Sequence, residues 1–202
     1  MNRREKAAED GGQGIALIQR AKQGDVDAFA RLAAQYKDRI RNYVARLCGD
    51  PPEAEDLTQE VFVRAFVAMR RFRGVAAFQT WLYKIATNIA LDALRRRRRA
   101  GPAALSLDAP IETEESPVQR ELADSSQDPH QTVATRELQH EVQQAITELS
   151  DKLRVVIVLF DIQGLTYEEI ADVLGVPLGT VKSRLFNARM ALRQRLKPYV
   201  EQ

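Results

Sequence analysis

The stretch LTYEEIADVLGVPLGTVKSRLFNAR, residues Leu165 to Arg189, has the spacing of two short helices joined by a tight turn. Thr166 and Glu169 have the spacing of a capping box. In a capping box, the Thr166 hydroxyl accepts a hydrogen bond from the backbone N–H of Glu169, and the Glu169 carboxylate accepts one from the backbone N–H of Thr166. Gly175 stands where the first helix should end, because glycine adopts a positive φ without a steric penalty. The pattern predicts a helix-turn-helix.

The second helix of this motif has an apolar side and a basic side. Val176, Val181 and Leu185 supply the apolar side. From Lys182 to Val200 there are six Lys or Arg residues and no acidic residue, whereas an exposed helix normally carries both signs. Such a helix suits insertion into the major groove of DNA, with an αα-hairpin and a solvated basic face as the alternative. The side chains on the polar side are Lys182, Ser183, Arg184, Phe186, Asn187 and Arg189.

The net charge of +2 conceals an uneven distribution along the 202 residues. The segment from Arg70 to Arg99 has nine basic residues and one acidic residue. The next segment, from Ala100 to Thr135, has seven acidic residues and one basic residue, together with four of the eight prolines. It has no apolar periodicity, which is typical of a flexible tether. Basic segments on both sides of an acidic one indicate nucleic-acid-binding modules that the mean charge hides.

Composition excludes several kinds of chemistry. The single cysteine, Cys48, excludes an internal disulfide bond and a cysteine-based zinc site. His130 and His140 fall in or beside the acidic segment, which argues against a histidine-based metal site or catalytic triad. The chain has no run of about 18 apolar residues and no signal peptide. We therefore expect a cytoplasmic protein that is not itself a membrane protein. We also expect no enzymatic activity and no metal or cofactor.

No strand pattern is present, so the expected fold class is all-α, with two small helical domains joined by a flexible acidic linker. The sequence Asp50-Pro51-Pro52-Glu53 is a strong helix start, with a capping aspartate and proline in the first turn. The expected helices before the helix-turn-helix span about residues 15–23, 26–47, 51–70, 77–97, 133–149 and 152–162. The expected divisions are an N-terminal tail over 1–14, a first domain over 15–99, the linker over 100–132 and a second domain over 133–202.

The third of these helices has more apolar residues than one core-facing side requires. Its core stripe comprises Ala54, Leu57, Val61, Ala65 and Met69. The further apolar residues are Phe62, Val63, Phe66 and Val67, so a partner or a neighbouring helix should cover a second face. Glu53, Asp56 and Glu60 share one side at three-then-four spacing, with Gln59 beside them. These carboxylates form either a solvated acidic face or a docking face for a basic partner.

The segment RRFRGVAAFQTWLYKIATNIALDALRRRRR, which begins at Arg70, interleaves aromatic and cationic side chains. Cations can follow phosphates while aromatic rings stack on unpaired bases, so the pattern favours binding of single-stranded nucleic acid. The amide of Asn88, which lies among apolar residues, is placed to bind the edge of a flipped base. Phe78 and Trp81 also fit a hydrophobic core. The five arginines from Arg95 to Arg99 need counter-charge, which phosphate would supply, unless they serve solubility alone. The candidate contacts are Arg71, Phe72, Arg73, Phe78, Trp81, Lys84 and Asn88.

Three motifs in order resemble those of the bacterial extracytoplasmic-function (ECF) sigma factors, the smallest class of sigma-70-type transcription initiation factors. The motifs are AEDLTQEVFVRAF, FQTWLYKIATNIALD and LTYEEIADVLGVPLGTVKSRLFNARMALR. The resemblance covers about Ile15 to Leu196, and it implies that residues 15–99 correspond to sigma region 2 and residues 133–197 to region 4. It also implies a function, directing core RNA polymerase to specific promoters and assisting promoter melting. The implied partners are core polymerase, promoter DNA and, in many members, a membrane-anchored or soluble anti-sigma factor.

The same resemblance implies roles for individual residues. Asn88 matches the position that lines the pocket for a flipped base of the downstream promoter element, and Arg71 to Ala77 match the specificity loop. The acidic linker is similar to the family's linker, an extended segment that can lie in the polymerase channels that later hold RNA and imitate the charge of RNA. Asn187 departs from relatives that carry arginine at that position. The positions matching the contact with the clamp helices of the largest polymerase subunit are Asp56, Gln59, Glu60 and Val63. Those matching positions that face the upstream element are Lys182, Ser183, Arg184, Phe186, Asn187 and Arg189.

Two other functions fit parts of the sequence. A free-standing helix-turn-helix regulator would bind duplex DNA without polymerase and usually as a dimer, but the chain offers no heptad dimerisation segment. A nucleic-acid enzyme would use Glu53, Asp56 and Glu60 as metal ligands, but no histidine, cysteine or nucleophile accompanies them.

Overall fold

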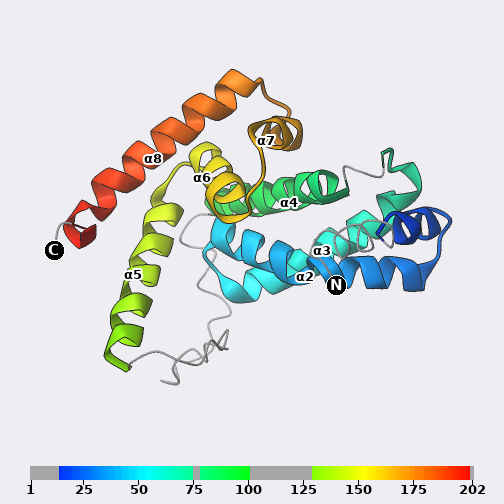
Figure 1. Ribbon diagram of the computed structural model, residues 1–202, viewed down its shortest axis with the longest axis horizontal. Coiled ribbons are helices and arrows are strands. Elements are labelled where there is room, and N and C mark those ends of the chain that lie inside the picture. Colours follow the sequence, from blue (N-terminus) through cyan, green and yellow to red (C-terminus); the bar gives the residue numbers. More distant parts are fainter. Residues whose placement is uncertain (1–13, 75–77, 101–128, 201–202) are drawn as a thin grey trace, which may run out of the picture.

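Helices form the part of the chain that the computed structural model describes, residues 14–74, 78–100 and 129–200 (Figure 1). No strand occurs in these ranges, and the all-α prediction is confirmed. Most of the predicted acidic linker and nearly all of the predicted N-terminal tail lie outside the described residues. Within them, no helix is both long and apolar enough to span a membrane. The first domain has a helix over residues 14–22, α2 (Val26–Cys48), α3 (Pro51–Ala68), the 3₁₀ helix η1 (Met69–Arg71) and α4 (Phe78–Ala100). The second has α5 (Pro129–Glu148), α6 (Asp151–Ile157), the π-helix η3 (Val158–Ile162), α7 (Tyr167–Leu174) and α8 (Leu178–Val200).

Local capping interactions set the helix boundaries in the first domain. Asp25 is the N-cap of α2, and its carboxylate accepts a 2.9 Å hydrogen bond from the backbone N–H of Ala28. Gly49 ends α2 with a φ of 70°, a left-handed conformation that favours glycine. Asp50 then caps α3 by accepting a 3.2 Å bond from the N–H of Glu53, so the helix start expected at this point is confirmed.

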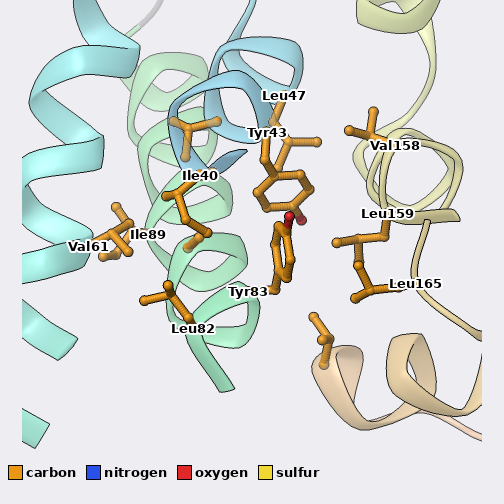
Figure 2. Packing of buried hydrophobic residues seen from close by; sticks show 14 of the residues in the cluster. Ile40, Tyr43, Leu47, Val61, Leu82, Tyr83, Ile89, Val158, Leu159 and Leu165 are labelled. Carbon is orange, nitrogen blue, oxygen red and sulfur yellow. The ribbon is translucent and has the colours of Figure 1, made fainter. Parts of the chain in front are cut away.

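The core of the first domain lies between α2, α3 and α4. Ile40, Val61, Leu82 and Ile89 are at most 1% exposed, and Figure 2 shows them packed together. Burial of each such side chain stabilises the fold by about 1.5–3 kcal/mol. The expected stripe on α3 is buried throughout, from Ala54 to Met69. The hydrophobic period of α3 was therefore a reliable guide to which side faces the core.

The second domain departs from the sequence-based expectation at two helices. Helix α5 begins at Pro129, four residues before the expected start and inside the predicted linker. The segment expected as one helix over 152–162 forms α6 and then a π-helical turn, in which Gln163 N–H donates 3.0 Å to Val158 O. The helix-turn-helix follows as expected. Both hydrogen bonds of the capping box are present, because Thr166 N–H donates to Glu169 Oε2 at 2.8 Å and Glu169 N–H donates to Thr166 Oγ1 at 3.2 Å. Gly175 ends α7 with a φ of 63°.

The two domains share one hydrophobic core. Tyr43 of α2 and Tyr83 of α4 meet edge to face at 5.2 Å, and Leu159 and Leu165 of the second domain lie against them (Figure 2). Helix α7 packs on α4, while α5, α6 and η3 pack on α2. The sequence predicted the domains themselves but not this packing.

Polar contacts reinforce the junction between the domains. The guanidinium of Arg154, on α6, is only 7% exposed and donates hydrogen bonds to three backbone carbonyls. Leu47 O belongs to the C-terminal turn of α2, whereas Thr147 O and Leu149 O belong to the end of α5 and the residue after it. Helix C-termini leave carbonyls without intrahelical partners, so Arg154 satisfies groups of both domains at once.

Candidate nucleic-acid interface

Helix α8 presents the polar side that the sequence predicted. Val181, Leu185 and Ala188 are at most 3% exposed and hold the helix against the rest of the domain. On the outer side Phe186 is 66% exposed, and Arg184 is half-buried. The other exposed side chains of the predicted set are Lys182, Ser183, Asn187 and Arg189. All six candidate residues therefore lie on α8 where a ligand can reach them, and their contact with DNA stays a prediction.

Two cations on this helix already have partners within the domain. Arg189 pairs with Asp161 through two hydrogen bonds, one of them 3.1 Å from Nε to Oδ2, and its guanidinium carbon lies 5.2 Å from the centre of the Phe160 ring. The hydrogen bond with Asp161 raises the pKa of Arg189 above its usual value. Lys182 Nζ lies 5.9 Å from the centre of the Tyr167 ring. Exposed pairs of this kind are worth about 0.2–1 kcal/mol, so phosphate can displace them.

The sequence did not point to the residues that hold these cations. Phe160 and Tyr167 stack at 4.7 Å with an interplanar angle of 11°. Asp161 is the acidic residue in the apolar segment VVIVLFDI, residues 155–162, and it pairs with a residue 28 positions away. An acidic residue within an apolar run is the one signal that could have drawn attention to it.

The polar candidates on and before α4 are accessible. Arg71, Arg73, Lys84 and Asn88 are exposed. The amide of Asn88 forms no hydrogen bond with any described residue, although Ile89 beside it is buried in the core. An amide that is held on a rigid helix and has no internal partner is available for the two-point hydrogen bonding by which Asn and Gln read a base edge.

The aromatic candidates form a cluster instead of an open platform. Phe72 and Phe78 are 4% and 3% exposed, whereas Trp81 is half-buried. The ring centres of Phe72 and Trp81 are 4.8 Å apart, and those of Phe78 and Tyr36 are 5.4 Å apart. The alternative of a core role fits Phe78 in this structure. Phe72 and Phe78 would have to leave the cluster to stack on a base, and residues 75–77 of the predicted specificity loop lie outside the described residues.

The outer side of α3 combines acidic and apolar residues. Asp56 and Gln59 are exposed, and Val63 is 63% exposed. Glu60 is half-buried and pairs with Arg64 at 2.5 Å. Phe66 and Val67 continue the same helix and are 39% and 75% exposed. The second apolar face expected on this helix is partly covered, because Phe62 is half-buried against the core and the Phe66 ring lies 5.1 Å from that of Phe29 on α2. Val63 and Val67 stay uncovered within the described part of the chain.

The carboxylates of α3 do not converge on a common point. Glu53 lies 3.5 Å from Arg97, and Glu60 pairs with Arg64. Among the described residues, no group of three or more His, Cys, Asp or Glu side chains could hold a metal ion. The described carboxylates therefore do not supply the metal-binding cluster that the hypothesis of a metal-dependent nucleic-acid enzyme requires.

Each of the two domains matches a family of known proteins. A model of Sigma-70 region 2 matches residues 32–100, and a model of Sigma-70 region 4 matches residues 139–192. The ECF RNA polymerase sigma factor SigW of Bacillus subtilis is 40% identical over 181 residues, which cover 89% of this chain and 95% of that protein. The chain belongs to the ECF sigma factors. The ECF RNA polymerase sigma-E factor of Escherichia coli K12 is 38% identical over 186 residues, 91% of this chain and 94% of that protein.

Two solved structures to which the chain is similar have the same fold. The sigma factor RpoE in complex with the anti-sigma factor NepR, from Bartonella quintana, gives a TM-score of 0.62 at 25% identity and covers 88% of this chain and 100% of that chain. CnrH in complex with the cytosolic domain of CnrY gives a TM-score of 0.67 at 24% identity, covering 92% and 98% of the two chains.

Membership of the ECF family establishes the overall function of the chain. It is an RNA polymerase sigma factor that acts in transcription initiation. The region 2 match contains α3 and α4, and the region 4 match contains α6, α7 and most of α8. The prediction from the three motifs is therefore confirmed, and the reading as a free-standing regulator is set aside.

Proposed function

We propose that this ECF sigma factor brings core RNA polymerase to its promoters through three surfaces with separate tasks. The outer side of α3 docks on polymerase, the Asn88 side of α4 holds the melted strand, and α8 reads the upstream duplex element. The sigma factor performs no catalytic step of its own, because polymerase supplies the chemistry. It works in the cytoplasm, where polymerase meets DNA.

The exposed acidic and apolar side of α3 is the observation that carries this proposal. Val63 and Val67 are 63% and 75% exposed, and Asp56 and Gln59 flank them. Apolar residues that a partner buries, with charged residues at the edge, are the usual composition of a protein–protein interface. The carboxylates at positions 56 and 60 set the expected charge of the partner, which is a basic surface on the clamp helices of the largest polymerase subunit.

On α4, Asn88 is proposed to bind one flipped base of the downstream element. Flipping a base costs a few kcal/mol, which hydrogen bonds to the base edge must offset. Lys84 and Trp81 lie on the same side of the helix one and two turns earlier, and they supply a cation and a stacking edge. Arg71 and Arg73 are proposed to contact the strand where it approaches this pocket. Phe72 and Phe78 hold Trp81 in place from the core side, with ring centres 4.8 and 5.6 Å away.

On α8, the six predicted residues are proposed to contact the upstream element as a duplex. Lys182 and Arg189 exchange their partners within the domain for phosphate or guanine, and Phe186 offers an apolar surface for a thymine methyl group. Ser183, Arg184 and Asn187 complete the polar side. Asn187 is neutral, so this position should tolerate more bases than an arginine would.

An anti-sigma factor is proposed as a further partner. The support is the similarity to RpoE of Bartonella quintana, whose structure was solved in complex with the anti-sigma factor NepR. A membrane-anchored anti-sigma factor would hold the chain at the inner membrane, whereas a soluble one would leave it in the cytoplasm. The predicted acidic linker is proposed to enter the polymerase channels that later hold RNA.

Reversal of one charge on α3 tests the docking surface. In the variant Asp56→Arg, an arginine would face the proposed basic partner, and like charges at an interface cost several kcal/mol. We expect pull-down of core polymerase to be lost while the circular dichroism spectrum stays unchanged. Asp38→Arg is the matched control, because Asp38 is 84% exposed on α2 and lies outside the proposed surface. Equal retention of both variants on core polymerase would contradict the proposed docking role of α3.

A further inference from the structure

Two stacked aromatic rings connect the π-helix η3, the start of α7 and the outer side of α8. The rings of Phe160 and Tyr167 have centres 4.7 Å apart and an interplanar angle of 11°. The guanidinium carbon of Arg189 lies 5.2 Å from the centre of the Phe160 ring, and Lys182 Nζ lies 5.9 Å from the centre of the Tyr167 ring. Two cations that are proposed to contact the upstream element therefore lie on one aromatic pair.

The backbone that carries these rings is fixed on both sides. Val158 and Leu159, directly before Phe160, are fully buried, and Figure 2 shows them among the packed core residues. Leu165 N–H donates a 3.0 Å hydrogen bond to Leu159 O, which ties the chain after η3 back to the π-helix. Tyr167 is the first residue of α7, whose start is fixed by its capping box. Both rings thus project from an anchored backbone.

The π-helical turn brings two consecutive residues to the same arginine. Phe160 lies against the guanidinium of Arg189, and Asp161 accepts hydrogen bonds from its Nε and one of its Nη atoms. Turns of π-helix are rare, and they frequently occur at functional sites. In this chain the turn coincides with the residues that hold an arginine of the proposed DNA-binding helix.

The face and the edges of this guanidinium have different partners. A guanidinium stacks on a ring through its planar face and donates its hydrogen bonds in the plane, from its edges. The Phe160 ring occupies the face of the Arg189 group, whereas Asp161 occupies one edge. A phosphate that replaces Asp161 at an edge leaves the contact with the ring intact. The ring contact can therefore persist when DNA is bound.

Contact with a ring reduces the cost of ordering a long side chain. An interface that immobilises a side chain with many rotamers loses free energy, and a side chain that is already ordered loses less. The Arg189 side chain is 52% exposed, yet the ring and the carboxylate hold it from two directions. Lys182 lies near the limit of about 6 Å for a cation–π contact, so its ring holds it less firmly. The effect should therefore concentrate on Arg189.

We propose that Phe160 is a positioning residue for the contact between Arg189 and a phosphate of the upstream duplex. Its ring holds the guanidinium in an orientation that presents an edge to DNA, and Tyr167 supports that ring by stacking on it. The inference rests on the proposed function of α8, which makes Arg189 a DNA contact. Phe160 touches no DNA itself, so it contributes to affinity through Arg189 alone.

A role in packing alone would have a different consequence. Phe160 is half-buried and also packs against the hydrophobic core. If its only task were to stabilise the domain, its loss would affect binding to the same extent with or without Arg189. Positioning predicts that the effect of losing Phe160 disappears once Arg189 is removed. A double-mutant cycle separates these two cases.

The experiment uses the full chain and a fluorescent duplex that the wild-type chain selects from a random-sequence library. Phe160→Leu, Arg189→Gln and the double variant are titrated at several salt concentrations, after urea denaturation has shown that each is folded. Phe160→Tyr keeps the ring. Phe160→Met replaces the leucine variant if that variant does not fold, because methionine fills irregular gaps. Leu153→Ala is the control for packing, since Leu153 is a half-buried residue of the same domain that packs on the core from α6.

Phe160→Leu should weaken binding about two- to fivefold, the range for an exposed cation–π contact. Its slope of log affinity against log salt concentration should equal that of the wild type, because the charge of Arg189 still meets its phosphate. Arg189→Gln should reduce this slope by about 0.9, and adding Phe160→Leu to it should weaken binding no further. Phe160→Tyr and Leu153→Ala should bind like the wild type.

Three results would overturn the positioning role. The first is an unchanged affinity of Phe160→Leu, and the second is an equal loss from Phe160→Leu with and without Arg189. The third is a loss in Leu153→Ala as large as that in Phe160→Leu, because it would assign the effect to domain packing.

Two further outcomes separate this inference from the proposed function. If Arg189→Gln binds like the wild type while Lys182→Gln binds more weakly, α8 contacts DNA without Arg189. The positioning role is then wrong, although the proposed function of α8 stands. If the wild-type chain selects no duplex from the library, the proposed function of α8 fails, and the positioning role fails with it.

Discussion

The hydroxyl of Tyr83 donates a 2.7 Å hydrogen bond to the side-chain oxygen of Gln163. Tyr83 lies on α4, on a different side from Asn88, and Gln163 directly follows η3, just before the helix-turn-helix. This bond therefore links the proposed single-strand reader to the proposed duplex reader. Together with Arg154, it makes the two domains one packed unit in the structure.

Removal of the buried cation at the junction should destabilise the whole chain. In Arg154→Met, the three backbone carbonyls that accept hydrogen bonds from the guanidinium would be left buried without a donor. Each unsatisfied carbonyl costs about 1–3 kcal/mol where water cannot take the place of the guanidinium. We expect the free energy of unfolding to fall by about 3 kcal/mol in urea denaturation. Arg31→Met, at an exposed position, should stay within about 0.5 kcal/mol of the wild type. An unchanged urea midpoint for Arg154→Met would mean that the junction adds nothing to stability.

The stability of the chain should decline in alkaline solution. Burial raises the pKa of Tyr83 to about 12 and that of Cys48 to about 12, and it also raises the pKa of Tyr43. The unfolded chain loses these protons near pH 9 to 10, whereas the folded chain keeps the protons of Tyr83 and Cys48 until about pH 12 and keeps that of Tyr43 throughout this range. Since the folded state then binds more protons, the free energy of unfolding falls as pH rises from about 9 to about 12, by up to about 1.4 kcal/mol per pH unit for each group.

The variant Tyr83→Phe isolates one contribution to this decline. It removes the ionisable hydroxyl, so the free energy of unfolding should fall less steeply between about pH 10 and 12 than in the wild type. At neutral pH it should cost about 1 kcal/mol, because the hydrogen bond to Gln163 is lost. Tyr167→Phe is the control, since the Tyr167 hydroxyl has no hydrogen-bond partner among the described residues. Identical alkaline slopes for the wild type and Tyr83→Phe would show that Tyr83 does not titrate differently in the two states.

Sequence patterns predicted those features that depend on neighbours along the chain. The caps at Asp50 and Thr166, the end of α7 at Gly175 and the buried side of α3 each follow from residues within two helical turns. The exposed side of α8 followed from its lack of acidic residues. In each case the local chemistry and the helical period leave few alternatives.

Features that depend on distant polar pairs could not be predicted. Arg154 binds Leu47 O across 107 residues, and Tyr83 binds Gln163 across 80. The five arginines of α4 look equivalent in sequence, and only the packing around them shows that Arg97 and Arg98 pair with residues of other helices. Phe72 and Phe78 likewise fit either a core or a stacking platform until their neighbours are known.

The pairing of Arg189 with Asp161 should compete with DNA. In Asp161→Asn the guanidinium loses its charged partner and becomes available to phosphate, so the free chain should bind an upstream duplex element up to about fivefold more tightly, the equivalent of about 1 kcal/mol. Arg189→Ala should weaken the same binding. It should also reduce the slope of log affinity against log salt concentration by about 0.9, the value for one lost phosphate contact. Fluorescence titration at several salt concentrations measures both effects. Weaker binding by Asp161→Asn would instead assign Asp161 the task of positioning Arg189.

The most direct test of the account is promoter melting by the Asn88→Ala variant with core polymerase. Loss of a two-point contact with a flipped base costs about 1–3 kcal/mol, so open complexes should form poorly while polymerase binding persists. Asn42→Ala is the matched control, because Asn42 is an exposed asparagine on α2 without a partner among the described residues. Permanganate footprinting on duplex and pre-melted templates measures the result. We expect weak thymine reactivity on duplex for Asn88→Ala alone, with partial recovery on the pre-melted template. Normal melting with unchanged base preference would contradict the account.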